Sequence, residues 1–389
     1  MQNQNNTTNR IVIAGDLLPS EKNMKLFEEG SAKAIFGEKI TDLFSQSNFS
    51  IFNLEGPLTD SSKAMEKTGP VIKASKECIR GIKGLGVKAV AMANNHITDY
   101  QKDGYEDTVK LLDDNGIGYL GAGENSENIK KSISLSLGNK RICIYNVSEQ
   151  FYNLPTPISL GANVYDEYVV CNDIKELKQS HDYLIIIYHG GTEEFPYPTP
   201  LLRKHFHRMA DCGADFITAQ HTHCVGCCEN YNGAYLLYGQ GNFLFARMKN
   251  KMNRQGLISE IVFSDDDIQI KQHVVSVSDE DVVRYDDVQD LSGFCERSEE
   301  LLNYERIEDN FKRFAYQRPS IKDRFLTAYR GDTLYYRMIN RIAPKLYKKH
   351  ILEKYKREQL LRMVKTLESE RYAEDLCAAV YYMLENTKK

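Results

Sequence analysis

The stretch Gly213-Ala-Asp-Phe-Ile-Thr-Ala-Gln-His-Thr-His-Cys224 joins a short apolar run to a pair of histidines. Residues 216–219 predict a buried strand. His221 and His223 follow it two positions apart, so in an extended backbone both imidazoles point to the same side. Open α/β sheets place their ligands just beyond such strand ends. Taken alone, however, two histidines in this spacing are more often part of an ordinary surface loop, so the pair depends on what the rest of the chain supplies.

The composition favours a large folded protein without bulk affinity for nucleic acid. The chain has 389 residues, 42% of them hydrophobic, and a formal net charge of −4. This length suits either one large domain with an appendage or two domains. Its nine cysteines are scattered and odd in number, which favours reduced thiols in the cytoplasm. The polar N-terminus resembles no signal peptide, and no apolar run reaches 18 residues. We therefore expect a cytoplasmic location and no nucleic-acid partner.

Apolar runs at residues 10–14, 49–53, 87–93 and 183–188 predict strands, and segments of helical spacing lie between them. This alternation predicts an α/β layered domain over residues 9–277. Residues 278–389 are predicted to form a mainly helical region that is first acidic and then basic. Three alternatives are open for its basic, tyrosine-rich part: it presents solvated helix faces, makes peripheral contact with an anionic membrane surface or polymer, or pairs with the acidic part.

Polar residues of ligand type follow one predicted strand after another. Each has an ordinary explanation by itself, such as a helix cap for Asp16 or a turn for Glu55. The ends of parallel strands share one rim of a sheet, so together these side chains are predicted to converge. The series is Asp16, Glu55, Asn95 with His96, His189, and finally His221 and His223.

The chemistry of this series predicts a metal centre. A carboxylate, an amide oxygen and neutral imidazoles suit Mn, Fe or Zn better than Ca²⁺, which prefers oxygen ligands. One or two such ions can clamp a phosphoryl group and activate water. If Asn95 holds the metal, His96 beside it is placed to protonate a leaving group as general acid.

Seven motifs in this order resemble the CapA type of bacterial capsule and poly-γ-glutamate biosynthesis proteins, a family similar to calcineurin-like metallophosphoesterases. The resemblance covers roughly residues 10 to 250. The motifs are Gly15-Asp16, Asn53-Leu-Glu-Gly-Pro-Leu-Thr59, Asn94-Asn-His96, Gly121-Ala-Gly123, His189-Gly-Gly-Thr-Glu193, His221-Thr-His223 and Gly241-Asn-Phe243.

The resemblance implies a four-layer αββα sandwich with a two-metal centre, to which the chain adds its helical C-terminal appendage. It implies one ion on Asp16 and His223, a second on Asn95, His189 and His221, and a bridging Glu55. It also implies that His96 is the acid and that Asp99 and Glu193 orient histidines. The asparagines of three motifs are expected to bind substrate; they are Asn53, Asn94 and Asn242.

One motif departs from the phosphoesterase pattern. The usual Asp-x-His is Asp16-Leu17-Leu18 here, which leaves the first ion one ligand short. The resulting hypothesis is a metal-dependent hydrolase of phosphorylated or polyanionic substrates, linked to capsule or polymer synthesis proteins. Two alternatives remain open: a non-catalytic accessory protein that binds an anionic surface polymer or its synthase, and a γ-glutamyl amide hydrolase, because activated water does not itself choose phosphorus over carbon.

Overall fold

A computed structural model describes most of the chain and divides it into two compact units, Met1–Phe311 and Lys312–Lys389. No helix within the described ranges is long and apolar enough to cross a membrane. The described residues are 9–67, 69–150, 160–245, 251–265, 267–317 and 334–347.

The first sheet has a parallel half and an antiparallel half. Its strand order is β16-β15-β14-β1-β2-β3-β4, and β13 pairs with β1 off this path. Strands β1 to β4 and β13 pair in parallel, whereas β14, β15 and β16 pair antiparallel. The strands are β1 (Asn9–Leu18), β2 (Phe49–Leu54), β3 (Ala89–Ala91), β4 (Gly118–Leu120), β13 (Asn242–Phe245), β14 (Gln255–Phe263), β15 (Ile268–Val277) and β16 (Val283–Tyr285).

The second sheet has a parallel centre with antiparallel edges, in the order β11-β12-β10-β9-β7-β6. Strands β6 and β7 form a hairpin across Gly138-Asn139, with Leu137 opposite Lys140. The strands are β6 (Ile133–Leu137), β7 (Lys140–Ser148), β9 (Tyr183–His189), β10 (Phe216–Gln220), β11 (Cys228–Tyr231) and β12 (Ala234–Leu237), while β5 (Ala122–Gly123) and β8 (Gly161–Ala162) pair separately.

Several helices begin at residues that satisfy free backbone amides. The Asp166 carboxylate accepts from Val169 N at the start of α7, and the Thr199 hydroxyl accepts from Leu202 N at the start of α8. Such caps stabilise a helix by about 1 kcal/mol. The helices are α1 (Met24–Glu28), α2 (Ala32–Phe36), α3 (Glu38–Ser45), η1 (Lys76–Cys78), α4 (Ile79–Gly84), α5 (Gln101–Asp114), α6 (Ser126–Ile129), α7 (Glu167–Ser180), α8 (Pro200–Asp211), η2 (Lys251–Arg254), α9 (Ser292–Glu300), α10 (Tyr304–Gln317), α12 (Leu334–Ile342) and α13 (Pro344–Tyr347).

Alternate residues of the central strands pack into different cores. Ile11 and Ile13 of β1 share a core with Ile142, Ile185 and Ile187 of the second sheet, so the two sheets face each other directly. This is the expected result for strands buried on both faces, which read as continuous apolar runs.

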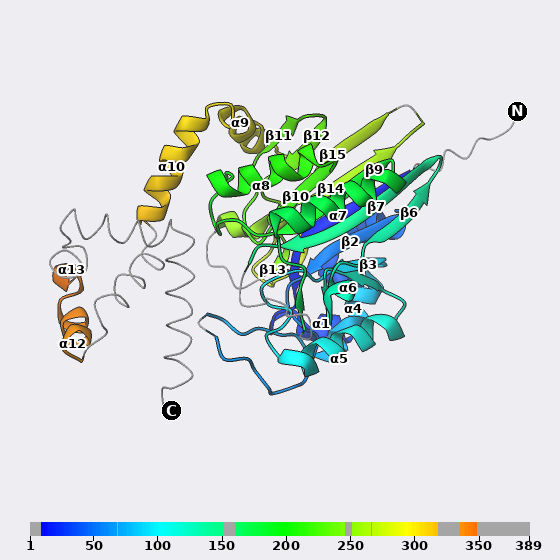
Figure 1. Cartoon of the computed structure of the whole chain (residues 1–389). Helices are drawn as coiled ribbons and strands as arrows, with labels where there is room; N and C mark the ends of the chain where they lie inside the picture. The colour runs from blue at the N-terminus through cyan, green and yellow to red at the C-terminus, as the bar shows by residue number, and fades with distance from the viewer. Residues whose placement is uncertain are drawn as a thin grey trace, which may run out of the picture. The chain divides into compact units, whose positions relative to one another are not determined.

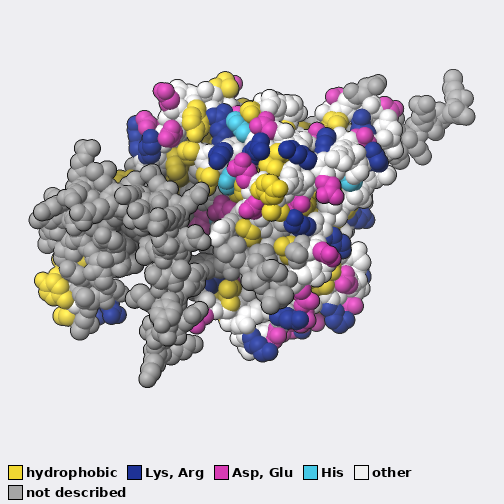
Figure 2. Space-filling model, viewed as in Figure 1, with side chains coloured by type: hydrophobic (Ala, Val, Ile, Leu, Met, Phe, Trp, Pro, Cys, Tyr) yellow, Lys and Arg dark blue, Asp and Glu magenta, His cyan; other side chains and the backbone are white. Residues whose placement is uncertain are grey.

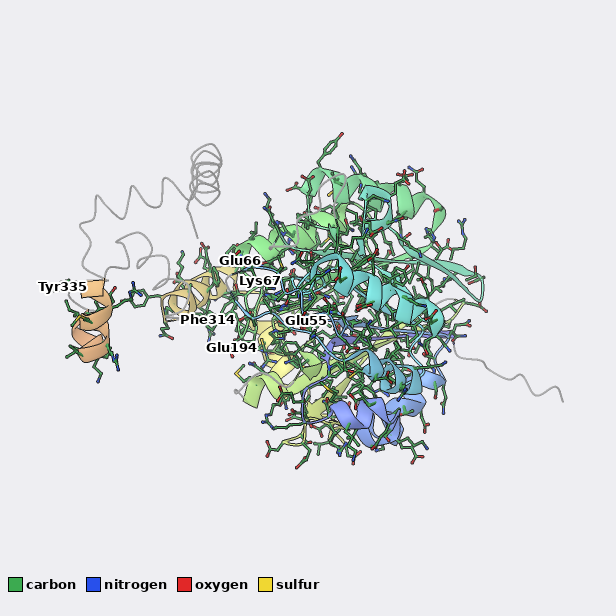
Figure 3. The ribbon with its side chains drawn as sticks, turned by 90° about the horizontal axis from the view of Figure 1, so that it is seen from below. Glu55, Glu66, Lys67, Glu194, Phe314 and Tyr335 are labelled. Atoms are coloured by element: carbon green, nitrogen blue, oxygen red, sulfur yellow. The ribbon has the colours of Figure 1, made fainter. Side chains whose placement is uncertain are left out.

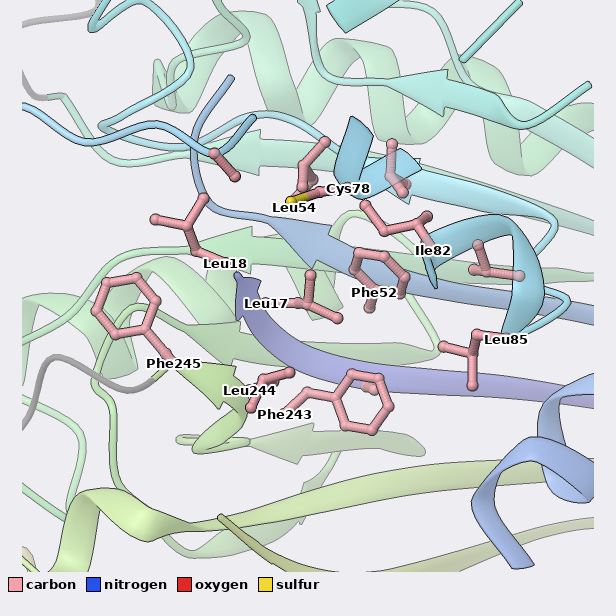
Figure 4. Packing of buried hydrophobic residues seen from close by; sticks show 14 of the residues in the cluster. Leu17, Leu18, Phe52, Leu54, Cys78, Ile82, Leu85, Phe243, Leu244 and Phe245 are labelled. Carbon is pink, nitrogen blue, oxygen red and sulfur yellow. The ribbon is translucent and has the colours of Figure 1, made fainter. Parts of the chain in front are cut away.

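The outer faces of both sheets are covered by helices. Val12 and Phe52 of the first sheet pack with Phe27, Phe44 and Ile82 from α1, α3 and α4. Figure 4 shows part of this cluster, in which Phe52 lies beside Ile82 of α4, and the ring centroids of Phe52 and Phe243 are 6.1 Å apart.

On the far side, Tyr145 and Ile186 pack with Ile174 of α7 and Phe206 of α8. In Figure 1, α7 and α8 therefore lie on one side of the paired sheets, and α1, α4 and α5 on the other. The predicted four-layer αββα sandwich is confirmed.

The region after residue 277 begins with structure that continues the first unit. Strand β16 pairs with β15, and Phe294 of α9 packs with Leu237 and Val274. The boundary that we place after residue 277 stays a prediction. The basic, tyrosine-rich part falls largely on residues 318–333 and 348–389, outside the described residues.

Candidate metal centre

The side chains predicted at the strand ends gather where the two facing sheets share one edge. Asp16 lies near the end of β1 and Glu55 directly follows β2, both in the first sheet. His189 ends β9 and His221 directly follows β10, both in the second sheet. Because these strands run in parallel within each sheet, their carboxyl ends bring the four side chains together.

A close approach between two chain segments sets the position of Asp16. A Cβ atom on Gly15 would lie 2.1 Å from the carbonyl oxygen of Gly241, so only glycine fits there. The register of β1 shifts at this point, and Asp16 comes opposite Asn242 of β13. The Gly15-Asp16 motif thus combines a glycine that the packing requires with a carboxylate that can bind a metal.

Asp16, Glu55 and His223 form one group of potential ligands, whose donor atoms all lie within 4.8 Å of one another. His223 Nε2 is 3.7 Å from Glu55 Oε1, and His223 Nδ1 is 3.5 Å from Asp16 Oδ2. All three residues are buried. The arrangement can hold a cation between two carboxylates and an imidazole.

Glu55, His189 and His221 form a second group within the same 4.8 Å limit. Asn95 joins it, because its Oδ1 is 3.0 Å from His189 Nε2. Two donor atoms that each bind an ion at about 2.1 Å, at right angles to each other, lie about 3.0 Å apart. Glu55 belongs to both groups, as the bridging role predicted for it requires.

Glu193 forms a third group with His221 and His223. Sequence reasoning gave this glutamate a supporting role through histidine orientation. Its carboxylate reaches the two histidines that belong to different ligand groups, so it approaches both halves of the site.

The two histidines after β10 do not have the extended backbone that the sequence predicts. His221 and His223 have φ angles of 83° and 52°, in the left-handed region that costs non-glycine residues about 1–3 kcal/mol. A hydrogen bond of 2.9 Å from His221 N to Asp16 Oδ2 holds this bend. The rings nevertheless lie together, with centroids 5.8 Å apart, so the convergence comes from the bent loop and not from strand periodicity.

The three asparagines that we expected to bind substrate are fully buried; Asn53 and Asn242 contact ligand residues, and Asn94 contacts Asn53. Asn242 Oδ1 lies 2.8 Å from His223 Nδ1, and Asn53 Nδ2 donates to Asp16 Oδ1 over 2.8 Å. Asn94 Nδ2 donates to Asn53 Oδ1 over 3.0 Å. These bonds orient the ligands, as supporting residues do in metal sites. Their contact with substrate stays a prediction.

The electrostatics of the centre fit a cation. Burial, and then the neighbouring Asp16, Glu193 and Asp99, hold the pKa of Glu55 well above its usual value. Burial also raises the pKa of Asp16. Among the described residues neither Glu55 carboxylate oxygen has a hydrogen-bond partner. A buried carboxylate without a partner costs several kcal/mol, which a bound cation offsets.

His189 is also in the state that a metal requires. Burial, followed by His221 and His223, lowers the pKa of His189 well below its usual value. Neutral imidazole is the form that binds metal ions. The donor set of carboxylates, amide oxygen and neutral imidazoles therefore fits a divalent transition metal.

His96 and Asp99 form a hydrogen-bonded pair beside the two ligand groups. His96 Nδ1 is 2.7 Å from Asp99 Oδ2, and both residues are buried. Lys67 forms a short ion pair with Asp99 Oδ1. Sequence reasoning missed Lys67, because a lysine in a polar loop looks like any solvated residue; Figure 3 labels it together with Glu55.

A cavity of about 630 Å³ borders the centre. Leu18, Tyr100 and Phe245 line it, and Phe245 stacks on His223 with ring centroids 4.7 Å apart. Lys22 and Lys73 also line this cavity. In the view of Figure 2, acidic and basic side chains are interspersed over the described surface, as the small net charge leads one to expect.

Residues 10–247 match the family model described as "Bacterial capsule synthesis protein PGA_cap". The chain is 24% identical over 246 residues to "Capsule biosynthesis protein CapA" of Bacillus anthracis, covering 60% of this chain and 59% of that protein. It is 28% identical over 240 residues to "PGA biosynthesis protein CapA" of Bacillus subtilis, covering 60% and 62%. These matches span about three fifths of the length of the curated relatives.

Two solved structures are similar at low identity. A hypothetical protein from Thermus thermophilus has a TM-score of 0.43 at 15% identity, covering 68% of this chain and 98% of that one. The 5'-nucleotidase from Candida albicans has a TM-score of 0.41 at 12% identity, covering 72% and 54%.

Proposed function

The chain belongs to the bacterial capsule synthesis protein family PGA_cap, whose model matches residues 10–247, and from this premise we propose that it is a metal-dependent hydrolase serving the synthesis of an anionic surface polymer. Glu55 carries the proposal. Its side chain is 1% exposed, both of its oxygens lack a hydrogen bond among the described residues, and it belongs to two groups of potential metal ligands.

Two ions sharing Glu55 would account for the arrangement. The first would be held by Asp16, Glu55 and His223, and the second by Glu55, His189 and His221 with Asn95. The donor types favour Mn, Fe or Zn. A divalent ion bound there would act as a Lewis acid toward the substrate and lower the pKa of water.

His96 is the residue of the chain proposed to move a proton. Its Nδ1 faces Asp99 Oδ2 at 2.7 Å, so in the neutral ring Nδ1 carries the hydrogen and Nε2 remains to exchange a proton with substrate. Burial lowers the pKa of His96, while the bond to Asp99 opposes this shift. A charged His96 would therefore give its Nε2 proton readily to a leaving oxygen, and Asp99 would hold the ring in place.

The proposal is tested by comparing the wild-type protein with Glu55→Gln, a substitution of the same shape that removes the charge. We expect the wild type to bind Mn²⁺ in calorimetry and to hydrolyse bis(4-nitrophenyl) phosphate, and Glu55→Gln to lose both. Glu260→Gln is a matched control, because Glu260 is also a buried carboxylate but is paired with His273 and Arg10 away from the centre. A Glu55→Gln protein that binds Mn²⁺ as the wild type does would refute the proposal.

A non-catalytic accessory role is the second candidate, and one observation favours it. At the position of the usual Asp-x-His ligand, Leu18 is an apolar side chain with 3% exposure, so the first ion receives nothing from it. One relative, from Mycobacterium tuberculosis, is named "Probable polyglutamine synthesis accessory protein". Binding of poly-γ-glutamate that survives EDTA and Glu55→Gln, without turnover of phosphoester or γ-glutamyl amide substrates, would establish this role instead.

A further inference from the structure

We propose that Lys67 is a positioning residue of this centre, which holds the His96–Asp99 pair in place from the loop between β2 and η1. The inference rests on the proposed function, because it concerns the residue to which that function assigns proton transfer. No motif of the sequence includes Lys67.

Lys67 is buried to an unusual degree for a lysine. Its side chain is 3% exposed and its partner Asp99 is fully buried, whereas Arg203, another well-buried cation in an ion pair, is 19% exposed. Lysine is almost never fully buried without a partner, since removing its charge from water is costly. A well-packed apolar residue would fill the same space without this desolvation cost, so we infer that the ammonium group has a specific role.

The contacts of Lys67 Nζ define that task. It forms the short ion pair with Asp99 Oδ1 and lies 3.3 Å from the carbonyl oxygen of Asn95. Asn95 is the residue whose side chain faces His189, and its carbonyl belongs to the peptide that leads into His96. Lys67 thus holds both the Asp99 carboxylate that contacts the His96 ring and the peptide group that precedes His96 in the chain.

The proton arrangement makes this role distinct from a direct bond to the ring. Lys67 Nζ is also 3.3 Å from His96 Nδ1, but Nδ1 is closer to Asp99 Oδ2, at 2.7 Å. A nitrogen that donates its hydrogen to the carboxylate has no lone pair left for the ammonium. Lys67 therefore acts on His96 through Asp99 and Asn95, and the Nε2 atom stays available for a substrate.

The loop that carries Lys67 is fastened at its base and near its tip. At the base, Thr59 N bonds to Ala74 O over 2.9 Å, closing the loop. Near the tip, Met65 N bonds to Asp99 O and Ile72 N bonds to Asp99 Oδ2, both over 2.8 Å. Figure 1 shows the connection as a long blue loop between β2 and the helices that follow it. Residues on both sides of Lys67 in the sequence thus bind Asp99.

The experiment compares Lys67→Met, which keeps the length of the side chain and removes its charge, with Lys67→Arg, which retains the charge. Lys63→Met is the matched control, because Lys63 lies in the same loop but its side chain is 70% exposed and pairs with Asp103. The readouts are kcat and KM for bis(4-nitrophenyl) phosphate with Mn²⁺, Mn²⁺ affinity by calorimetry, and hydrogen exchange at the amides of Met65 and Ile72.

For Lys67→Met we expect kcat to fall about 100-fold, the scale of a lost general acid, with KM and Mn²⁺ affinity within about threefold of wild type. Lys67→Arg should recover most of kcat, and Lys63→Met should leave kcat unchanged. Exchange at Met65 and Ile72 should be faster by about tenfold or more in Lys67→Met, because a charge-assisted bond that holds Asp99 is lost.

Two results would overturn the inference: a Lys67→Met protein with unchanged kcat, or one in which kcat and Mn²⁺ affinity fall together by the same factor. If the wild type turns over no substrate, the proposed function fails. Amide hydrogen exchange then tests the positioning role of Lys67 independently of activity. Unchanged protection of the Met65 and Ile72 amides in Lys67→Met would refute that role.

Discussion

Replacing Asn242 by alanine tests how the centre orients its histidines. Asn242 Oδ1 lies 2.8 Å from His223 Nδ1, and its Nδ2 donates to Asn253 O over 2.7 Å. Both bonds are buried, so Asn242→Ala leaves a ring nitrogen and a carbonyl group unsatisfied. Each costs about 1–3 kcal/mol, which predicts a loss of about 2–6 kcal/mol in the free energy of unfolding.

The same change is expected to weaken metal binding. Without the Asn242 acceptor, the hydrogen on His223 Nδ1 keeps only the more distant Asp16 Oδ2, at 3.5 Å, so Nε2 is held less firmly as the atom facing Glu55, 3.7 Å away. Loss of such a supporting bond typically lowers metal affinity about 10–100-fold, which corresponds to about 1.4–2.7 kcal/mol.

Calorimetric titration with MnCl₂ and urea denaturation together separate the two effects. Asn163→Ala is the control: Asn163 is buried and donates to Asn146 O over 2.9 Å, so this variant should lose stability and keep its Mn²⁺ affinity. If Asn242→Ala lost stability but bound Mn²⁺ within twofold of wild type, the orientation of His223 by Asn242 would not govern metal binding.

Two further changes test other parts of the structure. Gly15→Ala places a Cβ 2.1 Å from Gly241 O, which is a backbone atom. We therefore expect the free energy of unfolding to fall by at least about 1–3 kcal/mol, the usual cost of overpacking. The loss would appear as a lower urea midpoint, and an unchanged midpoint would contradict the close approach. Burial lowers the pKa of His205 to about 4. Between pH 6.5 and 4 the unfolded chain therefore binds a proton that the folded chain does not, and the free energy of unfolding falls on acidification. Urea midpoints measured over this range should depend less on pH in His205→Gln, and an equally steep decline in that variant would show that other groups cause it.

The layers of the fold could be predicted because the strands are apolar runs that end abruptly in polar residues. Ile185 and Ile187 of β9 are buried against the first sheet, and the strand ends at His189 as expected. The same signal found Asp16 and Glu55. Strand ends are local features of a sequence, and the parallel arrangement then brings them together without further information.

Three features of the site depend on contacts that local patterns do not contain. The left-handed backbone at His221 and His223 is held by Asp16, far away in the chain. Asn242 contacts His223 only because β13 pairs with β1, which brings Asn242 opposite Asp16. Lys67 is buried because Asp99 and the Asn95 carbonyl bind its ammonium group. Each is a tertiary contact that overrides what its own segment favours.

The pairing of β1 with segments late in the chain has a consequence for synthesis on the ribosome. The bond from His221 N to Asp16 Oδ2 joins residues 205 positions apart. At translation rates of about 5–20 residues per second, Asp16 emerges about 10–40 s before this partner. During that interval β1, an apolar strand buried on both faces in the finished protein, has neither β13 nor β14 beside it. The nascent chain therefore exposes this apolar strand before its partners β13 and β14 have been made, and the site around Asp16 is complete only after His221 and His223 have emerged.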